Sequence, residues 1–469
     1  MNACKVLAID LGSGSGRGIW GALKNGRIEC VKEVHRFKNG FIQINGGIYW
    51  DYVAIYRGIL DCLRACKKKD LRVDSLSIDG WSQDYAYLSA NGEVLGLPRS
   101  YRDPVNRWNN TQFEDAQNIA PMAFSRASGA SRASISTLRQ LWYDRNFRKP
   151  LFEAADKILH IPYLMVYLLT GETACDPSLL SIGELGDVRT MHGSQQTYTR
   201  LGVTGKMPVE RTWGSVIGRT DCSVRAETEI DTIPVICTMG HDTSSAVSAI
   251  PDDGEFLWVS SGSYNMLGAV LRRSYIDDRL LQAGFSNTPL DDGRVCVMAG
   301  SGGGMYYAQQ CMKRWQAYDE KISYPSLTEY ALEHRTKRTF LFEDVPDEAE
   351  NMPKAIQDAI KMSGFEISQS PQELYEAFCN GMATAIARKL VFLEETIGKR
   401  FGRVYIIGGG SQAHGVNIRL AERMQKDIYT GLTEASALGN LLAQGIAMGA
   451  IGQNWRGKLQ SDLFQMRRF

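Results

Sequence analysis

Two stretches of the chain share one pattern of apolar and polar positions. In residues 8–23, AIDLGSGSGRGIWGAL, an apolar run ends in Asp10, a Ser/Gly turn follows, and a second apolar run begins after Arg17. Residues 256–271, FLWVSSGSYNMLGAVL, repeat this order in the second half of the chain. Apolar runs on both sides of a short glycine-containing turn are typical of β-hairpins, so each stretch is predicted to form one.

The same elements are predicted after both hairpins. In the first half, a strand near 48–50 precedes a helix from Asp51 and a strand over 75–79. The second half has a strand over 295–299, a helix over 373–398 and a strand over 403–407. Residues 104–200, mostly helical in pattern, interrupt the first half. The shared order predicts a duplicated α/β domain with an active cleft between the copies.

The tip of the first hairpin suits a phosphate group. Its glycines let the backbone approach a ligand and direct N–H groups at an anion, and its serines add hydroxyl donors. Asp10, just before the turn, could hold a hydrated magnesium ion. An ordinary Gly/Ser hairpin with an exposed acid is the alternative. Gly16, Gly18 and Gly21 match G-x-G-x-x-G, but a turn and a strand follow, so a dinucleotide fold is excluded; no P-loop motif occurs.

Asp242 is the candidate catalytic residue. It begins a predicted helix after a strand over 233–238. The helix N-terminus would keep its carboxylate ionised and able to accept a proton from a hydroxyl group. A simple N-cap is the alternative.

A polar and aromatic cluster follows the strand over 75–79. Open α/β sheets bind ligands at the carboxyl ends of their strands. The alternative is a turn with its tryptophan packed in the core. The candidate sugar contacts in this cluster are Trp81, Ser82, Gln83 and Asp84.

The composition narrows the classes of protein. The 469 residues, 44% of them hydrophobic, are enough for two or three domains. A net charge of +1 gives no support for nucleic acid or an acidic membrane as the main partner. The ten cysteines are scattered, which indicates free thiols in a reducing cytoplasm. The apolar tract 158–170 is too short for a membrane span and is predicted to be a buried helix.

Several short motifs occur in a fixed order along nearly the whole chain. They are Asp10-Leu11-Gly12…Gly16-Arg17, Ile78-Asp79…Trp81…Asp84, Tyr101-Arg102-Asp103, Gly240-His241-Asp242-Thr243, Ser260-Ser261-Gly262, Gly408-Gly409-Gly410 and Glu434-Ala435-Ser436…Leu438-Gly439-Asn440. This order resembles the FGGY carbohydrate kinases and, within them, the rhamnulokinase subfamily.

The resemblance implies two ribonuclease-H-like domains of the actin-like ATPase fold. An N-terminal sugar-binding domain would cover 1–244 and a C-terminal nucleotide-binding domain 245–469. The implied reaction is phosphorylation of a ketose hydroxyl, with ATP and Mg²⁺ as cofactors. L-Rhamnulose, giving L-rhamnulose 1-phosphate, is the first expected substrate; L-fuculose and xylulose are the alternatives. The protein would be a cytoplasmic monomer or homodimer.

The resemblance also implies roles for individual residues. Asp242 would be the proton acceptor and Asp10 would organise magnesium. The substrate contacts would be Ser82, Asp84, His241, Asp242, Thr243 and Ser301. The ATP contacts would be Ser13, Gly14, Ser15, Gly16, Arg17, Ser263, Gln309, Gly408, Gly409 and Gly410.

The chain departs from the family where the sugar would be read. The subfamily pattern Thr-Trp-Gly-Val-Asp is Gly-Trp-Ser-Gln-Asp over residues 80–84, so Ser82 replaces a glycine, and Ser301 stands in place of an asparagine. A site built on hydroxyl hydrogen bonds discriminates strongly, so these changes could switch the sugar. Two other classes remain as alternatives: an actin-like ATPase that acts as a chaperone or filament subunit, and a sugar sensor without catalysis.

Overall fold

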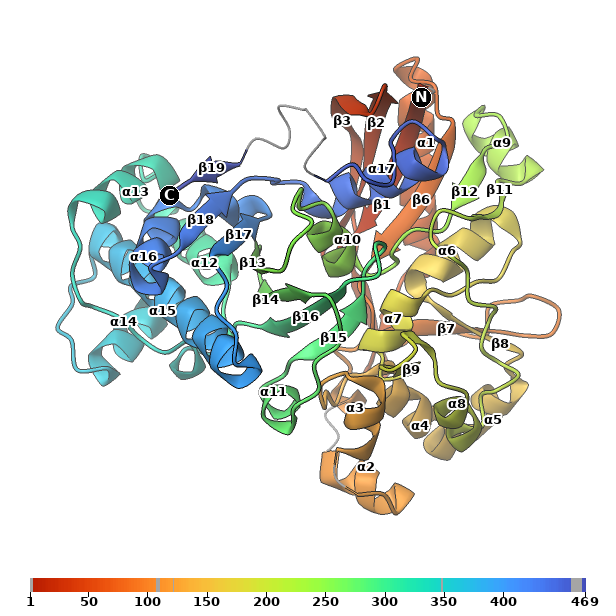
Figure 1. The fold of residues 1–469 in the computed structure, drawn as a ribbon, viewed down its shortest axis with the longest axis horizontal. Coiled ribbons are helices and arrows are strands. Elements are labelled where there is room, and N and C mark those ends of the chain that lie inside the picture. Colours follow the sequence, from red (N-terminus) through yellow and green to blue (C-terminus); the bar gives the residue numbers. More distant parts are fainter. Residues whose placement is uncertain (1–2, 107–109, 121, 347–348, 457–465) are drawn as a thin grey trace. The chain divides into compact units, whose positions relative to one another are not determined.

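The structure, a computed structural model, describes residues 3–106, 110–120, 122–346, 349–456 and 466–469. The chain divides into two compact units, each built around one β-sheet (Figure 1). Unit 1 comprises Met1–Asp253, Leu271–Val297 and Ala435–Leu463, and unit 2 comprises Gly254–Val270, Met298–Glu434 and Phe464–Phe469. This division differs from the predicted single boundary at 244/245, because the chain returns to unit 1 twice.

The sheet of unit 1 has the strand order β11-β12-β6-β1-β2-β3. Strands β1, β6 and β12 run parallel, and β2 and β3 continue the sheet antiparallel. These strands are β1 (Cys4–Leu11), β2 (Ser15–Lys24), β3 (Arg27–Lys38), β6 (Ser75–Gly80), β11 (Val216–Arg219) and β12 (Pro234–Ile236). The predicted first hairpin and the strand over 75–79 are confirmed.

Alternation along β1 sends its side chains to opposite faces of the sheet. Leu7, Ile9 and Leu11 join a core with residues of α1 (Tyr52–Lys68) and α6 (Ile161–Thr170). Helix α17 (Ala435–Ala447) also packs on β1 and β6. Asp51 caps α1 as predicted, accepting a hydrogen bond from the backbone N–H of Ala54 at 3.0 Å.

The tract 158–170 corrects one prediction. It is divided between β8 (Lys157–His160) and α6 instead of forming one helix. Pro162 lies in the first turn of α6, where the missing N–H costs no hydrogen bond.

Apart from α6, the α-helices over 104–200 share a second core with β7 and β8. Within the described residues, no helix is long and apolar enough to cross a membrane. The remaining elements of unit 1 are β4 (Phe41–Ile44), β5 (Gly47–Trp50), β7 (Tyr85–Leu88), η1 (Pro104–Asn106), α2 (Asn110–Gln117), α3 (Ala123–Ser128), α4 (Thr137–Phe147), α5 (Lys149–Ala154), α7 (Pro177–Ile182), β9 (Gly186–Asp187), β10 (His192–Gly193), α8 (Gln195–Leu201), α9 (Cys222–Thr228), α10 (Asp242–Ser248), α11 (Asp278–Gln282) and β15 (Ser286–Pro289).

Unit 2 repeats the pattern of unit 1 with the consecutive strands β14-β13-β17-β18-β19, in a sheet that continues from β14 to β16. A hairpin of β13 and β14 is followed by parallel pairing of β13, β17 and β18. The predicted duplication is therefore confirmed. Its elements are β13 (Phe256–Ser261), β14 (Asn265–Leu271), β16 (Val295–Gly300), α12 (Met305–Gln316), α13 (Tyr324–Glu333), η2 (Phe342–Asp344), α14 (Met352–Met362), α15 (Pro371–Ile397), β17 (Arg403–Ile407), η3 (Gly409–Gln412), α16 (His414–Met424), β18 (Asp427–Thr430) and β19 (Arg467–Arg468).

Candidate active site

Three carboxylates come from neighbouring segments at one edge of the sheet in unit 1. Asp10 in β1 lies opposite Asp79 in β6, in parallel register. The N–H of Gly80, the next residue of β6, donates to the carbonyl of Gly240 at 2.9 Å. Two residues further on, Asp242 begins α10. The carboxyl ends of parallel strands are where open α/β sheets bind ligands.

Asp10 and Arg17 form an ion pair at the base of the first hairpin. Both Nε and Nη2 of Arg17 donate to Oδ2 of Asp10, at 3.0 and 2.7 Å. The Asp10 side chain is 8% exposed and that of Arg17 19% exposed. The tip between β1 and β2 carries Ser13, Gly14 and Ser15, and Gly14 is exposed. The predicted phosphate loop is therefore held beside the predicted magnesium residue; both roles remain predictions.

The Asp242 carboxyl group differs from the sequence-based prediction in its ionisation. Burial and the Asp10 carboxylate raise its pKa from 3.8 to about 7, although hydrogen bonds from Thr243 act in the opposite direction. The surrounding protein therefore outweighs the helix N-terminus that was expected to keep Asp242 ionised. Its side chain is still 29% exposed, so a ligand can reach it.

His241 is held neutral next to Asp242. Burial lowers its pKa to about 4. Its Nδ1 lies 3.1 Å from Oγ of Ser244, and its Nε2 lies 3.6 Å from Oδ1 of Asp242. A neutral imidazole in this position can form a hydrogen bond with a sugar hydroxyl without placing a positive charge beside the carboxyl group.

Three of the four residues over 81–84 are buried in the protein. Asp84 is fully buried, and its Oδ2 accepts hydrogen bonds from the indole N–H groups of Trp50 and Trp81 at 2.6 and 3.1 Å. Its Oδ1 accepts a bond from Gln140 at 3.2 Å. Ser82 is only 5% exposed. In this structure Asp84 anchors the strand end, with both carboxylate oxygens bonded to protein groups, and its contact with a sugar stays a prediction.

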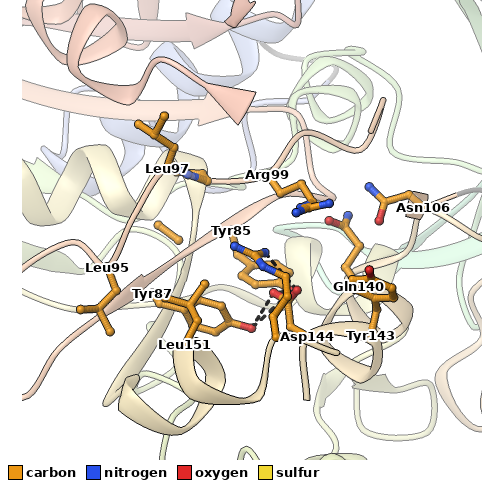
Figure 2. A pocket seen from close by; sticks show the side chains of 13 residues that line it. Tyr85, Tyr87, Leu95, Leu97, Arg99, Asn106, Gln140, Tyr143, Asp144 and Leu151 are labelled. Carbon is orange, nitrogen blue, oxygen red and sulfur yellow. Dashed lines mark hydrogen bonds and ion pairs between the residues drawn. The ribbon is translucent and has the colours of Figure 1, made fainter. Parts of the chain in front are cut away.

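Figure 2 shows a pocket lined by residues of β7, α4 and α5 and the loop between β7 and η1. Oδ2 of Asp144 accepts hydrogen bonds from the hydroxyls of Tyr85 and Tyr87, both at 2.9 Å. Arg148 donates to the other oxygen at 3.0 Å. Gln140, which bonds Asp84, also lines the pocket. None of the predicted catalytic, metal or nucleotide residues lines it.

Unit 2 brings the predicted nucleotide residues together around its own hairpin. The first N–H groups of α12, at Met305 and Tyr306, donate to the carbonyls of Gly262 and Ser263 at 2.9 and 3.0 Å. One turn along α12, Oε1 of Gln309 accepts a hydrogen bond from Oγ of Ser263 at 3.4 Å. The hairpin tip and the start of α12 therefore form one surface.

The turn over 408–410 packs on the same hairpin. A Cβ atom added to Gly410 would lie 2.0 Å from Oγ of Ser261, and one added to Gly408 would lie 2.8 Å from the Ser261 carbonyl oxygen. Gly408 also has a positive φ of 82°. Only glycine allows this close approach, and Gly409 is exposed at the turn.

Ser301 belongs to unit 2, in contrast to the other predicted sugar contacts. It is 8% exposed, and its hydroxyl donates to the carbonyl of Gly303 at 2.9 Å. Its place in the glycine-rich turn after β16 is confirmed, while its contact with a sugar remains a prediction.

The residues of unit 1 suit a magnesium ion brought by a nucleotide. Among the described residues, no group of three or more His, Cys, Asp or Glu side chains could hold a metal ion alone. Magnesium in kinases needs only one or two carboxylates, because waters and phosphates complete its shell. Beside Asp10, Oδ1 of Asp79 is buried without a hydrogen-bond partner. The sequence motifs assign no role to Asp79.

Comparison with known proteins gives consistent relatives. Residues 261–448 match the C-terminal domain of the FGGY family of carbohydrate kinases. A rhamnulokinase from Oceanobacillus iheyensis is 29% identical over 462 residues, which cover 96% of this chain and 94% of the relative. A rhamnulokinase from Bacillus subtilis is 28% identical over 447 residues, covering 94% and 90%.

Solved structures share the fold at lower identity. A ligand-bound xylulose kinase from Lactobacillus acidophilus has a TM-score of 0.78 at 15% identity and covers 99% of this chain and 93% of its own. A glycerol kinase from Plasmodium falciparum with ADP has a TM-score of 0.76 at 12% identity, with 96% and 90% covered. This likeness shows the fold of the chain.

Proposed function

Since the chain belongs to the FGGY family of carbohydrate kinases and is an ATP-dependent sugar kinase, we propose that it converts L-rhamnulose to L-rhamnulose 1-phosphate. Rhamnulokinases cover nearly the whole chain at 26–29% identity, and this supports the choice of sugar. Xylulose or L-fuculose is the alternative, because Ser82 adds a side chain where the subfamily pattern has glycine.

The observation that carries the mechanism is the environment of Asp242. A carboxyl group with a pKa of about 7 is half ionised at neutral pH, and it remains a stronger base than an ordinary aspartate. We assign to Asp242 the role of accepting the proton of the reacting sugar hydroxyl. As the O–H bond breaks, the sugar oxygen attacks the γ-phosphorus, and the bond from that phosphorus to the β-γ bridging oxygen breaks to release ADP.

Residues around Asp242 would orient the sugar. His241 is neutral and 6% exposed, and the Thr243 hydroxyl already donates to Asp242 at 3.1 Å. Asp84, bonded to two indoles, would hold the wall of the pocket, and its contact with the sugar stays a prediction. Fixed polar groups of this kind contribute to rate mainly by positioning the reacting hydroxyl.

ATP is assigned to the two glycine-rich hairpins and the turn over 408–410. In this assignment Ser13–Arg17 and Ser263 bind phosphates, and Gln309 lies at the nucleotide. Asp10, with Asp79 behind it, would hold Mg²⁺, which neutralises phosphate charge when bound. Backbone N–H groups and hydroxyls at the hairpin tips supply the remaining donors.

A panel of ketoses tests the reaction and the sugar. Purified protein is mixed with ATP, Mg²⁺ and one ketose at a time, and ADP release is followed. L-Rhamnulose should give the highest kcat/KM. Higher kcat/KM with xylulose or L-fuculose would overturn the choice of sugar, and equal ADP release without any sugar would favour the actin-like ATPase.

The Asp242→Asn variant tests the proton acceptor. Sugar-dependent ADP release should fall by at least about 10³-fold, because base catalysis and local charge are both lost. ATP binding, measured by calorimetry, should change little. A variant with near-normal turnover would remove Asp242 from this role.

A further inference from the structure

A chain of buried polar side chains runs from α17 to the carboxylates of unit 1. Nδ2 of Asn440 donates to Oδ2 of Asp79 at 2.6 Å. Oδ1 of Asn440 accepts a bond from Nε2 of Gln444 at 2.8 Å, and that nitrogen also lies 3.0 Å from the carbonyl oxygen of Leu7. Oγ of Ser75 donates to Oε1 of Gln444 at 2.7 Å. All four polar side chains are fully buried.

This chain joins the two strands that carry the carboxylates. Leu7 lies in β1, three residues before Asp10, and Ser75 begins β6, which ends beside Asp79. Asp79 is pressed toward its neutral form by burial and by Asp10, so its pKa is raised well above the ordinary value. The hydrogen bond from the side-chain amide of Asn440 lowers the pKa of Asp79 and so opposes the effect of burial. It also fixes the orientation of the Asp79 carboxyl group.

Helix α17 also supports the helix that begins with Asp242. Oγ of Ser245 in α10 donates to the carbonyl of Ser436 at 2.8 Å. A Cβ atom added to Gly439 would lie 1.9 Å from the carbonyl oxygen of Ser245, so the two backbones touch. Helix α17 therefore contacts the three elements that carry the carboxylates: β1 with Asp10, β6 with Asp79 and α10 with Asp242.

We propose that Asn440 and Gln444 are positioning residues for phosphoryl transfer, acting through Asp79 on the arrangement of the carboxylates of unit 1. This inference rests on the proposed function, and it extends the site to a helix with no residue at the sugar or the phosphates. Asn440 is bonded directly to Asp79, and Gln444 lies one hydrogen bond further away, through Asn440. Loss of such an outer partner costs about 10- to 100-fold in activity or affinity where it has been measured around metal ligands.

The test compares Asn440→Ala with a matched control, Asn287→Ala. Asn287 is equally buried in unit 1, and its amide nitrogen donates to the carbonyls of Gly129 and Tyr275 at 3.0 and 3.2 Å and not to a carboxylate. Both variants should lose thermal stability. Only Asn440→Ala should lose about 10- to 100-fold in kcat, with KM for ATP and ketose within about twofold of wild type.

A second variant covers the case in which Asn440→Ala does not fold. Gln444→Leu keeps the side-chain volume and removes the bonds to Asn440 and Leu7, and it should lower kcat by about 10-fold. In a double variant the two effects should be less than multiplicative, because both residues act through one chain of bonds.

The outcomes separate the inference from the proposed function. Wild-type kcat in folded Asn440→Ala or Gln444→Leu would overturn the positioning role, as would an equal loss of kcat in Asn287→Ala. Wild-type protein that releases no ADP with any ketose would overturn the proposed function and, with it, this inference.

Discussion

The ionisation of Asp242 is decided by its neighbours and not by its place in a helix. A helix N-terminus stabilises a carboxylate by about 0.3–2 kcal/mol, and α10 has only 7 residues. Raising a pKa from 3.8 to about 7 corresponds to roughly 4 kcal/mol against the ionised form. Burial and the charge of Asp10 are therefore the larger effects. The result is a carboxyl group that can both accept and release a proton near neutrality.

This ionisation predicts a pH dependence. In the proposed mechanism the ionised form of Asp242 is the base, so kcat/KM for ATP should be lost as pH falls through about 7 and should level off above it. Initial rates are measured at constant ionic strength over pH 5.5–8.5, which extends about one and a half pH units on either side of the Asp242 pKa. His241→Asn is the control, since a group with a pKa of about 4 contributes nothing near 7. A profile that is flat across neutrality would contradict the prediction.

At the scale of elements, α17 is the helix whose place is least evident from local pattern. It comes late in the chain, after the turn over 408–410, yet it packs on β1, β6 and α10 of unit 1. Its buried face carries amides as well as apolar side chains, which is tolerable only because each amide is bonded. The backbone contact at Gly439 sets its distance from α10.

Gly439→Ala should therefore destabilise the protein strongly. The new methyl group would lie 1.9 Å from the carbonyl oxygen of Ser245, so α10 or α17 must move, at a cost of at least about 1–3 kcal/mol. Urea unfolding measures this cost, and kcat should fall as Asp242 shifts. Gly452→Ala is the control, because no atom lies within 4 Å of its added Cβ. Equal stability of the two variants would show that the helices are not in contact.

At the scale of the whole molecule, the chain distributes its candidate ligand residues over two units. The carboxylates, His241 and the first hairpin belong to unit 1, whereas Ser263, Gln309 and the turn over 408–410 belong to unit 2. A ligand stabilises the folded protein through the groups that bind it, by about 2.7 kcal/mol at a concentration of 100 Kd. A loss of protection in a variant can thus be assigned to the turn that carries the substitution.

Thermal unfolding with each ligand tests this division. ATP should raise Tm in wild type and in Asp242→Asn, but less in Gly410→Ala, where the added methyl group meets Ser261 Oγ at 2.0 Å. The ketose that is turned over should still protect Gly410→Ala. Gly402→Ala, with open space around its Cβ, should respond to ATP as wild type does. If ATP protected Gly410→Ala as fully as wild type, the assignment of the nucleotide to the turn over 408–410 would be wrong.

The sequence by itself determined the repeated order of elements. The hairpins, the strand over 75–79, the cap at Asp51 and the turn over 408–410 follow from local rules: alternation, turn glycines and capping act within a few residues. The ordered motifs then indicated the kinase family, and with it the candidate residues on both hairpins and at Asp242.

Only the tertiary structure decided which of these residues meet and what their environment does to them. Asp84 faces two indoles, and Asn440 reaches Asp79 across 361 positions of sequence. Such contacts depend on how strands are ordered and which helix covers them, and no local pattern encodes that. The pKa of Asp242 belongs to the same class, because desolvation and charge repulsion arise only after folding has gathered the carboxylates.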